Sequence, residues 1–234
     1  MNDTIRRRKS IRKYKPGPLD ASTMKEVEAH IMTIRPLYPE IKFSLEIINK
    51  AKRSFGINAP HYLILRSEEK EGAFENIGFI GQQMDLFFSE SGIGSCWVGM
   101  ARPGEECLSK LPYVICIAFG KPDEPVHRMS ISEFKRKPLS EISEGTDVRL
   151  ESARLAPSGM NSQNWYFVAE NGKIHCYRKK TGIILKSMMD KMSCIDMGIA
   201  LYHIKRESND FVFEKEIGIP DKKGYIYVGT VGIL

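Results

Sequence analysis

Apolar and polar positions along the 234-residue chain alternate with two different periods, which indicates a mixture of helices and strands. From Ile77 to Phe88 the apolar residues recur at steps of three and four, and this spacing predicts an amphipathic helix with Gly92 as its C-cap. Short apolar runs at Tyr62–Leu65 and Tyr113–Gly120 predict buried strands. The chain is therefore expected to belong to the α+β class.

Two shorter helices are expected from local signals. Thr23 and Glu26 stand in capping-box spacing, which predicts that a helix starts there and runs to Ile31. Another helix is predicted from Asp147 to Leu155, and it should stop before Pro157, because proline lacks the amide proton and disfavours helical conformation in the preceding residue.

The second half of the chain repeats the order of the first. The segment NWYFVAENGK corresponds to PHYLILRSE, IDMGIALYHIKRES to IGQQMDLFFSES, and YIYVGTVG to YVICIAFG. This similarity predicts two interlocked α+β pseudo-repeats, about residues 1–140 and 141–234, within one structural unit. Each pseudo-repeat has too few strands to close a core alone.

Composition excludes several classes of protein. With 42% hydrophobic and 27% charged residues the chain resembles an ordinary packed domain. No run approaches the roughly 18 apolar residues of a membrane span, and the N-terminus lacks the apolar segment of a signal peptide, so a cytoplasmic protein without membrane contact is expected. Five cysteines without a C-x-x-C pair predict reduced, buried packing residues, and no metal site is expected.

The net charge of +6 and the pI near 9.0 raise the question of a nucleic-acid partner. Basic residues are spread among acidic ones, however, and the only dense cluster is RRRKSIRKYK near the N-terminus, so nucleic-acid binding is not expected. The cluster could be a solvated terminus or a phosphate clamp. If the chain is extended there, Arg8, Ser10 and Arg12 share one face, and guanidinium groups match phosphate oxygens in pairs.

The stretch LAPSGMNSQNWYFV raises a similar choice between a plain loop and a ligand surface. We call residues 157–163 the Pro-Ser loop. Gly159 would allow a flat ligand to approach the backbone, and the amides of Asn161 and Gln163 could pin the loop by hydrogen bonds. Trp165 is assigned to the core.

Four strings carry a family resemblance: RRKSIRKY, APSGMNSQNWYF, GIGSCWVG and KRKPLSEI. Together they resemble the FMN-dependent nitroreductase family with its flavin reductase and dehalogenase relatives. The resemblance touches most of the chain, and the A-P-S-G-x-N-x-Q-x-W string is the most specific of the four. It implies a nitroreductase-like fold, with a central, mostly antiparallel sheet flanked by helices.

The resemblance also implies which residues bind FMN. Phosphate and ribityl contacts fall on Arg8, Lys9, Ser10, Arg12 and Arg136, although Lys135 or Lys137 could replace Arg136. Ring-edge contacts fall on Gly94 and Ser95, for which a simple helix-to-strand turn is the alternative. The covering loop would supply Pro157, Ser158, Gly159 and Asn161. No side chain is expected to act as a catalytic acid, base or nucleophile, since the five histidines stand in unrelated contexts.

The order of the strings departs from the family pattern. In the family the Pro-Ser motif soon follows the basic motif, and the flavin lies between two subunits. Here the basic motif belongs to the first pseudo-repeat and the Pro-Ser motif to the second, which predicts a fused dimer with one flavin site per chain. A monomer should therefore suffice.

The implied activity is a ping-pong oxidoreductase. FMN would take a hydride from NAD(P)H and reduce a small-molecule acceptor such as a nitroaromatic or a quinone. A flavin carrier or sensor without turnover is the alternative, and a basic nucleic-acid module, whose affinity would fall steeply with salt, is a more distant one.

Overall fold

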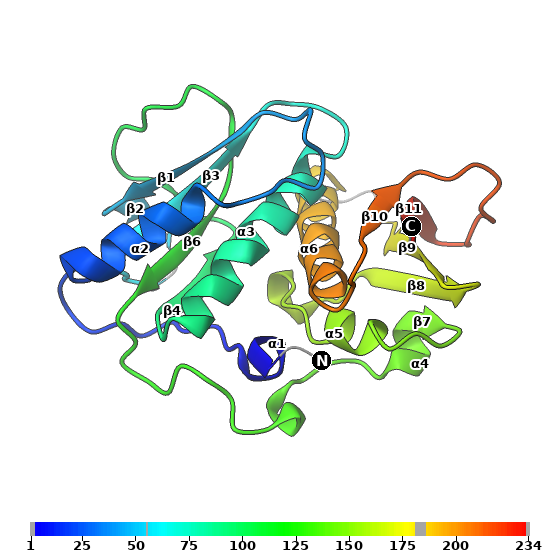
Figure 1. Ribbon diagram of the computed structural model, residues 1–234. Coiled ribbons are helices and arrows are strands. Elements are labelled where there is room, and N and C mark those ends of the chain that lie inside the picture. The colour runs from blue at the N-terminus through cyan, green and yellow to red at the C-terminus, as the bar shows by residue number, and fades with distance from the viewer. Residues whose placement is uncertain (1–2, 55, 181–185, 233–234) are drawn as a thin grey trace.

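The computed structural model describes residues 3–54, 56–180 and 186–232 (Figure 1). Its two longest helices, α3 (Ala73–Glu90) and α6 (Lys186–Arg206), pack against each other in the centre of the molecule. One antiparallel sheet packs on α3 and a second sheet packs on α6. The helix pair is thus enclosed between two sheets, and one continuous hydrophobic core joins both halves.

The first sheet has the strand order β1-β3-β6-β4, with all neighbours antiparallel; its strands are β1 (Phe43–Ile48), β3 (His61–Ser67), β6 (Tyr113–Gly120) and β4 (Gly94–Val98). The second sheet has the order β10-β11-β9-β8-β7; its strands are β10 (Val212–Glu214), β11 (Tyr225–Gly232), β9 (Lys173–Lys179), β8 (Trp165–Glu170) and β7 (Ser143–Glu144). In this sheet β7 runs parallel to its neighbour β8, and the other described strand pairs are antiparallel. A small ribbon pairs β2 (Ala51–Lys52) with β5 (Arg102–Pro103).

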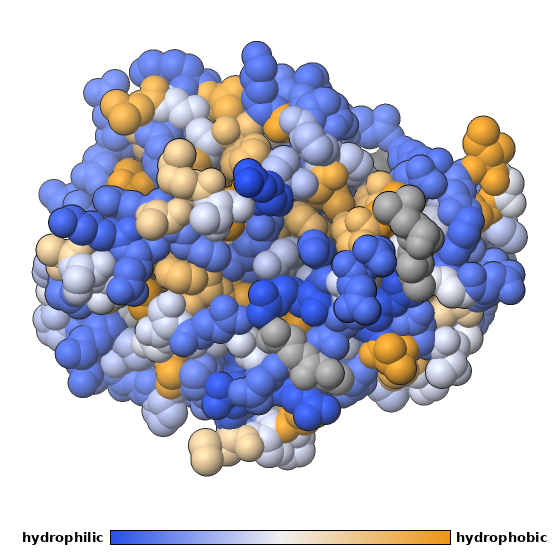
Figure 2. All heavy atoms as spheres, viewed as in Figure 1, coloured by the Kyte–Doolittle hydropathy of each residue, from blue (hydrophilic) through white to orange (hydrophobic). Residues whose placement is uncertain are grey.

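Short helices cover the margins of this arrangement: α1 (Asp3–Arg7), α2 (Ala21–Ile31), α4 (Leu139–Ile142), α5 (Leu150–Arg154) and the 3-10 turns η1 (Ile131–Glu133) and η2 (Gly159–Asn161). In the part of the chain that the structure describes, no helix has both the length and the apolar character needed to cross a bilayer. Figure 2 shows hydrophilic residues over most of one face, with apolar residues exposed in small separate groups. All five cysteines are free and buried, as predicted.

The α+β class and the antiparallel pairing are confirmed, but the strands form two main sheets instead of one central sheet. Read from β8, the second sheet has the order β8-β9-β11-β10, which is the order of the first sheet. Without the two-residue strands β2, β5 and β7, each half also runs strand, strand, long helix, strand, strand along the chain. The proposed match of NWYFVAENGK with PHYLILRSE is wrong by one strand, because topology aligns β8 with β1 and β9 with β3.

Most predicted elements are confirmed, with changes at their ends. The predicted capping residue of α2 is wrong: Asp20 is the N-cap, and its carboxylate accepts the backbone N–H of Thr23 at 3.0 Å. Asp20 is the better N-cap because its carboxylate also accepts the hydroxyl of Thr23, at 2.7 Å. Helix α3 ends with Ser91 as C-cap, and Gly92 follows with a φ of 70°. Helix α5 is shorter than predicted but ends before Pro157.

The central helices approach so closely that two glycines are required. A Cβ atom added at Gly78 would lie 2.0 Å from the carbonyl oxygen of Ile195, and one added at Gly198 would lie 1.9 Å from that of Glu75. These contacts are reciprocal, as a two-fold axis between α3 and α6 would make them. Neither obstacle is a flexible side chain, so the backbones themselves would have to separate.

We expect Gly78→Ala to lower the free energy of unfolding by about 2–4 kcal/mol, because overpacking against backbone cannot be relieved by a rotamer change. Urea denaturation measures the change. Gly232→Ala is the matched control, since nothing lies within 4 Å of its added Cβ. Equal effects of the two substitutions would contradict the close helix contact.

Candidate functional site

The basic segment near the N-terminus lies along the edge of the first sheet, next to β4. The backbone N–H of Ile11 donates to the carbonyl oxygen of Ser95 at 2.8 Å. A Cβ added at Gly94 would lie 2.8 Å from Cγ2 of Ile11 and 3.2 Å from Cβ of Pro122. The absence of a side chain at Gly94 therefore makes room for the basic segment.

Arg8 is buried and paired with an acidic residue of α3. It is 1% exposed, and its guanidinium lies 3.2 Å from the carboxylate of Asp85, which is 0% exposed. Arg8 also donates to the hydroxyl of Ser10 at 3.3 Å, and Ser95 donates its hydroxyl to Asp85 at 2.7 Å. Asp85 therefore fixes both the predicted clamp residue Arg8 and the predicted ring-edge residue Ser95.

A buried network extends from Asp85 to α6. His203 Nδ1 lies 2.8 Å from the carbonyl oxygen of Ser152, which can only accept, so Nδ1 carries the proton. The other ring nitrogen then accepts from the side-chain amide of Gln82, which also donates to Asp85 at 3.1 Å. Burial, with the charges of nearby arginines adding to it, lowers the pKa of His203 to about 3, so the ring is neutral.

Arg128 and Arg136 lie near Arg8, and we call these three residues the arginine cluster. Arg128 donates to the carbonyl oxygen of Arg8, and its guanidinium lies 4.0 Å from the centre of the Phe134 ring. Burial and the charge of Arg8 lower the pKa of Arg128 to about 10. Burial and the charges of Arg8 and Arg128 lower the pKa of Arg136 to about 9. The arginines destabilise one another's charged form, so an anion among them would be stabilised.

The segment around Arg136 is bonded to the Pro-Ser loop. Arg136 donates to the side-chain oxygen of Asn161, whose amide donates to the carbonyl oxygen of Lys135 at 2.7 Å. The backbone N–H of Lys137 donates to Gln163 at 2.7 Å. Residues 135–137 of the first pseudo-repeat and the loop of the second thus hold each other in place.

The loop also bonds to itself and to α6. The hydroxyl of Ser158 accepts the backbone N–H of Gln163 at 3.0 Å. Met160, Asn161 and Gln163 have φ values of 53°, 57° and 50°, a left-handed conformation that non-glycine residues rarely adopt. Such conformations persist only where surrounding bonds enforce them. Trp165, directly after the loop, is 2% exposed and packs in the main core, as predicted.

Asp196 of α6 holds this loop by hydrogen bonds. Its carboxylate accepts the backbone N–H of Gly159 at 2.9 Å and the hydroxyl of Ser162 at 3.4 Å. The residue is 4% exposed, and burial raises the pKa of its carboxyl to about 7. Near neutral pH the anchor therefore exists in both charged and neutral forms.

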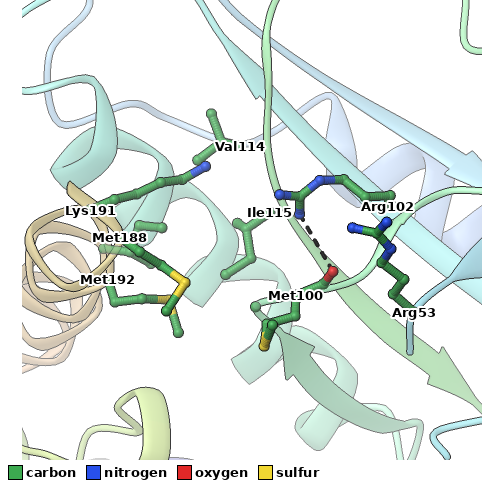
Figure 3. Close-up of a pocket in the computed structure, with 10 residues that line it drawn as sticks. Arg53, Met100, Arg102, Val114, Ile115, Met188, Lys191 and Met192 are labelled. Carbon is green, nitrogen blue, oxygen red and sulfur yellow. Dashed lines mark hydrogen bonds between the residues drawn. The ribbon is translucent and has the colours of Figure 1, made fainter. Parts of the chain in front are cut away.

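A cavity of about 120 Å³ opens beyond the loop, between α6 and the first sheet (Figure 3). Met192 separates it from the loop. A Cβ added at Gly159 would lie 2.8 Å from the Met192 methyl carbon, and one added at Gly99 would lie 2.7 Å from the same atom. Both glycines thus face the same flexible side chain.

The structure brings together most, but not all, of the residues singled out in the sequence. Arg8, Ser10 and Arg136 lie in the arginine cluster or bond to its members, and Arg12 is exposed beside it. Lys9 instead donates to Glu124 at 2.9 Å. Pro157 is buried at the start of the loop.

Sequence reasoning missed two carboxylates, Asp85 and Asp196, as well as Arg128 and the cavity. Both carboxylates were visible as single acids within apolar helical patterns, in QQMDLFF and CIDMGIA. An acid in such a position is buried, and a buried acid needs donors. Arg128 lies in an irregular segment whose pattern carries no comparable signal.

Comparison with protein-family models gives one match, which is described as "Putative TM nitroreductase" and spans residues 1–208. A search of curated proteins found no match.

Several solved structures are similar to this chain. The crystal structure of a "putative nitroreductase" from Thermotoga maritima has a TM-score of 0.67 and 19% identity, and covers 99% of this chain and 92% of that one. A nitroreductase family protein from Clostridium difficile 630 has a TM-score of 0.49 and 18% identity, covering 63% and 100%. A protein described as an FMN-dependent nitroreductase from Clostridium difficile R20291 has a TM-score of 0.43 and 17% identity, covering 58% and 96%. At these identities the first match establishes the shared fold.

The raised pKa of Asp196 predicts a pH-dependent effect of Asp196→Asn. The folded state binds this proton more tightly than the unfolded state, so the carboxyl lowers stability as pH rises from about 4 to 7. Asparagine can still accept the Gly159 N–H but cannot ionise. In urea denaturation, we expect the free energy of unfolding of the variant, relative to that of wild type, to rise by about 1–3 kcal/mol between pH 5 and pH 8. A stability difference that does not change with pH would show that Asp196 is not desolvated.

Proposed function

Because the chain belongs to the nitroreductase family, whose model spans residues 1–208, we propose that it is an FMN-dependent oxidoreductase that uses NAD(P)H. The acceptor would be a small molecule such as a nitroaromatic or a quinone. A distant relative is described as an FMN-dependent nitroreductase.

One observation carries the proposal. The Nε atoms of Arg8 and Arg136 are buried, and among the described residues neither has a hydrogen-bond partner. A buried guanidinium N–H without an acceptor is costly, and each of these two points to a missing acceptor. Both side chains belong to the arginine cluster. The three acceptor oxygens of a phosphate group would satisfy them, so the residues present fit FMN.

Specific roles follow for the residues that would hold FMN. Arg8, Ser10, Arg12, Arg128 and Arg136 would bind the phosphate and the ribityl chain. The Pro-Ser loop would cover the ring, with Gly159 allowing close approach, and Met192 would yield space because its thioether chain is flexible. Gly94 and Ser95 would act indirectly, since Gly94 accommodates Ile11 and Ser95 orients Asp85.

FMN supplies the hydride chemistry when it is bound. The protein must bind it, orient it and keep water from the reacting face. The pinned Pro-Ser loop is suited to this work, because Asp196 holds it from α6 and Asn161 and Gln163 hold it to residues 135–137. His203 is neutral and hydrogen-bonded through both ring nitrogens, so we assign it no proton transfer, and solvent would supply the proton that the acceptor takes up.

We further propose that one chain builds one complete site. Arg136 and Lys137 of the first pseudo-repeat bond to the Pro-Ser loop of the second within a single chain. The α3–α6 contact likewise joins the two halves as a subunit interface would. A partner subunit is then unnecessary, and the stoichiometry should be one FMN per chain.

The phosphate assignment predicts that Arg12→Gln weakens FMN binding about 10-fold, the effect of losing one hydrogen bond to a charged group. Arg12 is a better probe than Arg8, because Arg12 is exposed and its loss does not strand Asp85 in the core. Fluorescence titration of the flavin-free protein gives the affinity. Riboflavin, which lacks the phosphate, should bind weakly, and its affinity should not change with the substitution. Lys13→Gln is the charge-matched control, and an equal effect of both variants would indicate that the segment is only a general basic surface.

Loss of flavin colour on adding NADH separates an enzyme from a flavin carrier.

The one-chain site predicts that two defective variants cannot rescue each other. One variant carries Arg12→Gln with Arg128→Gln, and the other carries Gly159→Phe. Mixed under conditions that allow exchange, they should bind no more FMN than each does alone, because each chain contains one damaged wall of its own site. Regained FMN binding in the mixture, measured by titration and sedimentation, would show that two chains together build each site.

A further inference from the structure

We infer that the cavity beside α6 selects an electron acceptor that carries a negatively charged group on a single aromatic ring, an inference that rests on the proposed function. Three cationic side chains line this cavity: Arg53, Arg102 and Lys191. In Figure 3, Lys191 extends from α6 on one side, while Arg53 and Arg102 approach from the opposite side. Within the described residues, no Asp or Glu lines it.

Arg102 and Lys191 have neutral partners. Arg102 donates to the carbonyl oxygens of Ala101 at 2.9 Å and Met100 at 3.5 Å, and its guanidinium lies 5.2 Å from the centre of the Tyr113 ring. Lys191 lies 5.3 Å from the centre of the Phe74 ring. Carbonyl groups and ring faces orient a cation without cancelling its net charge. The positive potential of the cavity is therefore available to an anionic ligand.

The charge of Arg102 also acts on Lys191. Burial lowers the pKa of the Lys191 ammonium, and the charge of Arg102 lowers it further. An anion between the two side chains would relieve both effects, because it favours the charged form of each.

The rest of the wall is apolar and adaptable. Met100, Met188 and Met192 contribute thioether chains, which adjust to flat ligands and contact aromatic rings favourably. A volume of about 120 Å³ suits one aromatic ring, since an engineered cavity of roughly 150 Å³ in another protein binds benzene. The cations line this same small cavity, so the anionic group must be attached to the ring itself. In a nicotinamide dinucleotide the ribose separates the ring from the phosphates, which would lie outside.

The cavity can be tested without turnover by calorimetric titration of the whole protein with benzoate and with benzamide, which have nearly the same shape. Benzoate should bind at least about 10-fold more tightly, as expected for a hydrogen bond to a charged group. Arg53→Gln and Lys191→Gln should each weaken benzoate binding about 10-fold and leave benzamide unchanged. Arg53 is exposed, so its substitution should leave folding intact, and Lys25→Gln on α2 is the charge-matched control. Equal affinity for the two ligands, or no loss in the variants, overturns the inference.

The FMN-loaded protein provides the second measurement. NADH gives up a hydride and becomes NAD⁺. The nitro group of the acceptor then takes up the two electrons and one proton of this hydride together with one proton from solvent, becomes a nitroso group and releases water. The reduced protein should pass electrons to 4-nitrobenzoate about 10-fold faster than to 4-nitrobenzamide at low concentration, and Lys191→Gln should remove the difference. Reduction by NADH, followed separately, should change much less.

The two hypotheses fail in different ways. A protein that binds no FMN, or whose flavin NADH does not bleach, refutes the proposed function, and the benzoate titration still decides the charge of the cavity. If NADH reduces the bound flavin, but electron transfer to the two nitro compounds is equally fast, only the anionic acceptor is refuted. Equal slowing of both half-reactions in Lys191→Gln would also count against it, since that pattern indicates damage to the whole site.

Discussion

The close approach of α3 and α6 is the constraint on which the rest of the structure depends. At Gly78 and Gly198 each helix meets the carbonyl oxygen of the other, and any side chain there would force the backbones apart. Only at this separation can Gln82 of α3 bond to His203 of α6. The same amide reaches Asp85, which holds Arg8. The helix contact thereby sets the position of the arginine that we assign to the phosphate.

The approximate two-fold relation between the halves makes their differences informative. Asn76 and Asp196 stand two residues before the paired glycines. Asn76 accepts a backbone N–H from the loop before β1, and Asp196 accepts one from the loop before β8. The loops then diverge. In the first half, a Cβ added at Gly72 would lie 2.7 Å from the ring of Tyr38, so an aromatic side chain fills the space beside the helix. In the second half, the corresponding space holds the flexible end of Met192, and a cavity lies beyond it. This asymmetry supports one functional site per chain.

The sequence predicted what local patterns determine. The spacing in α3, the apolar runs of β3 and β6, and the end of α5 before Pro157 all depend on neighbours along the chain. The division of the strands into two sheets was not predictable, because β3 pairs with β6, which lies beyond α3 and β4 in the chain, and a pairing over that distance leaves no local pattern. The pairing of Arg8 with Asp85 spans most of the first pseudo-repeat, and a period of two or four residues carries no information about it.

The two buried carboxylates explain how a strongly basic site can fold before any anion arrives. Asp85 holds Arg8 and Ser95 on the side of the first sheet, and Asp196 holds Gly159 and Ser162 on the side of the second. A buried ion pair contributes little net stability, since desolvation offsets its attraction, but it fixes direction. Arg8 keeps one guanidinium nitrogen on Asp85 while its Nε has no acceptor among the described residues. The pair therefore positions a donor in advance, so that an arriving phosphate need not order the side chain that binds it.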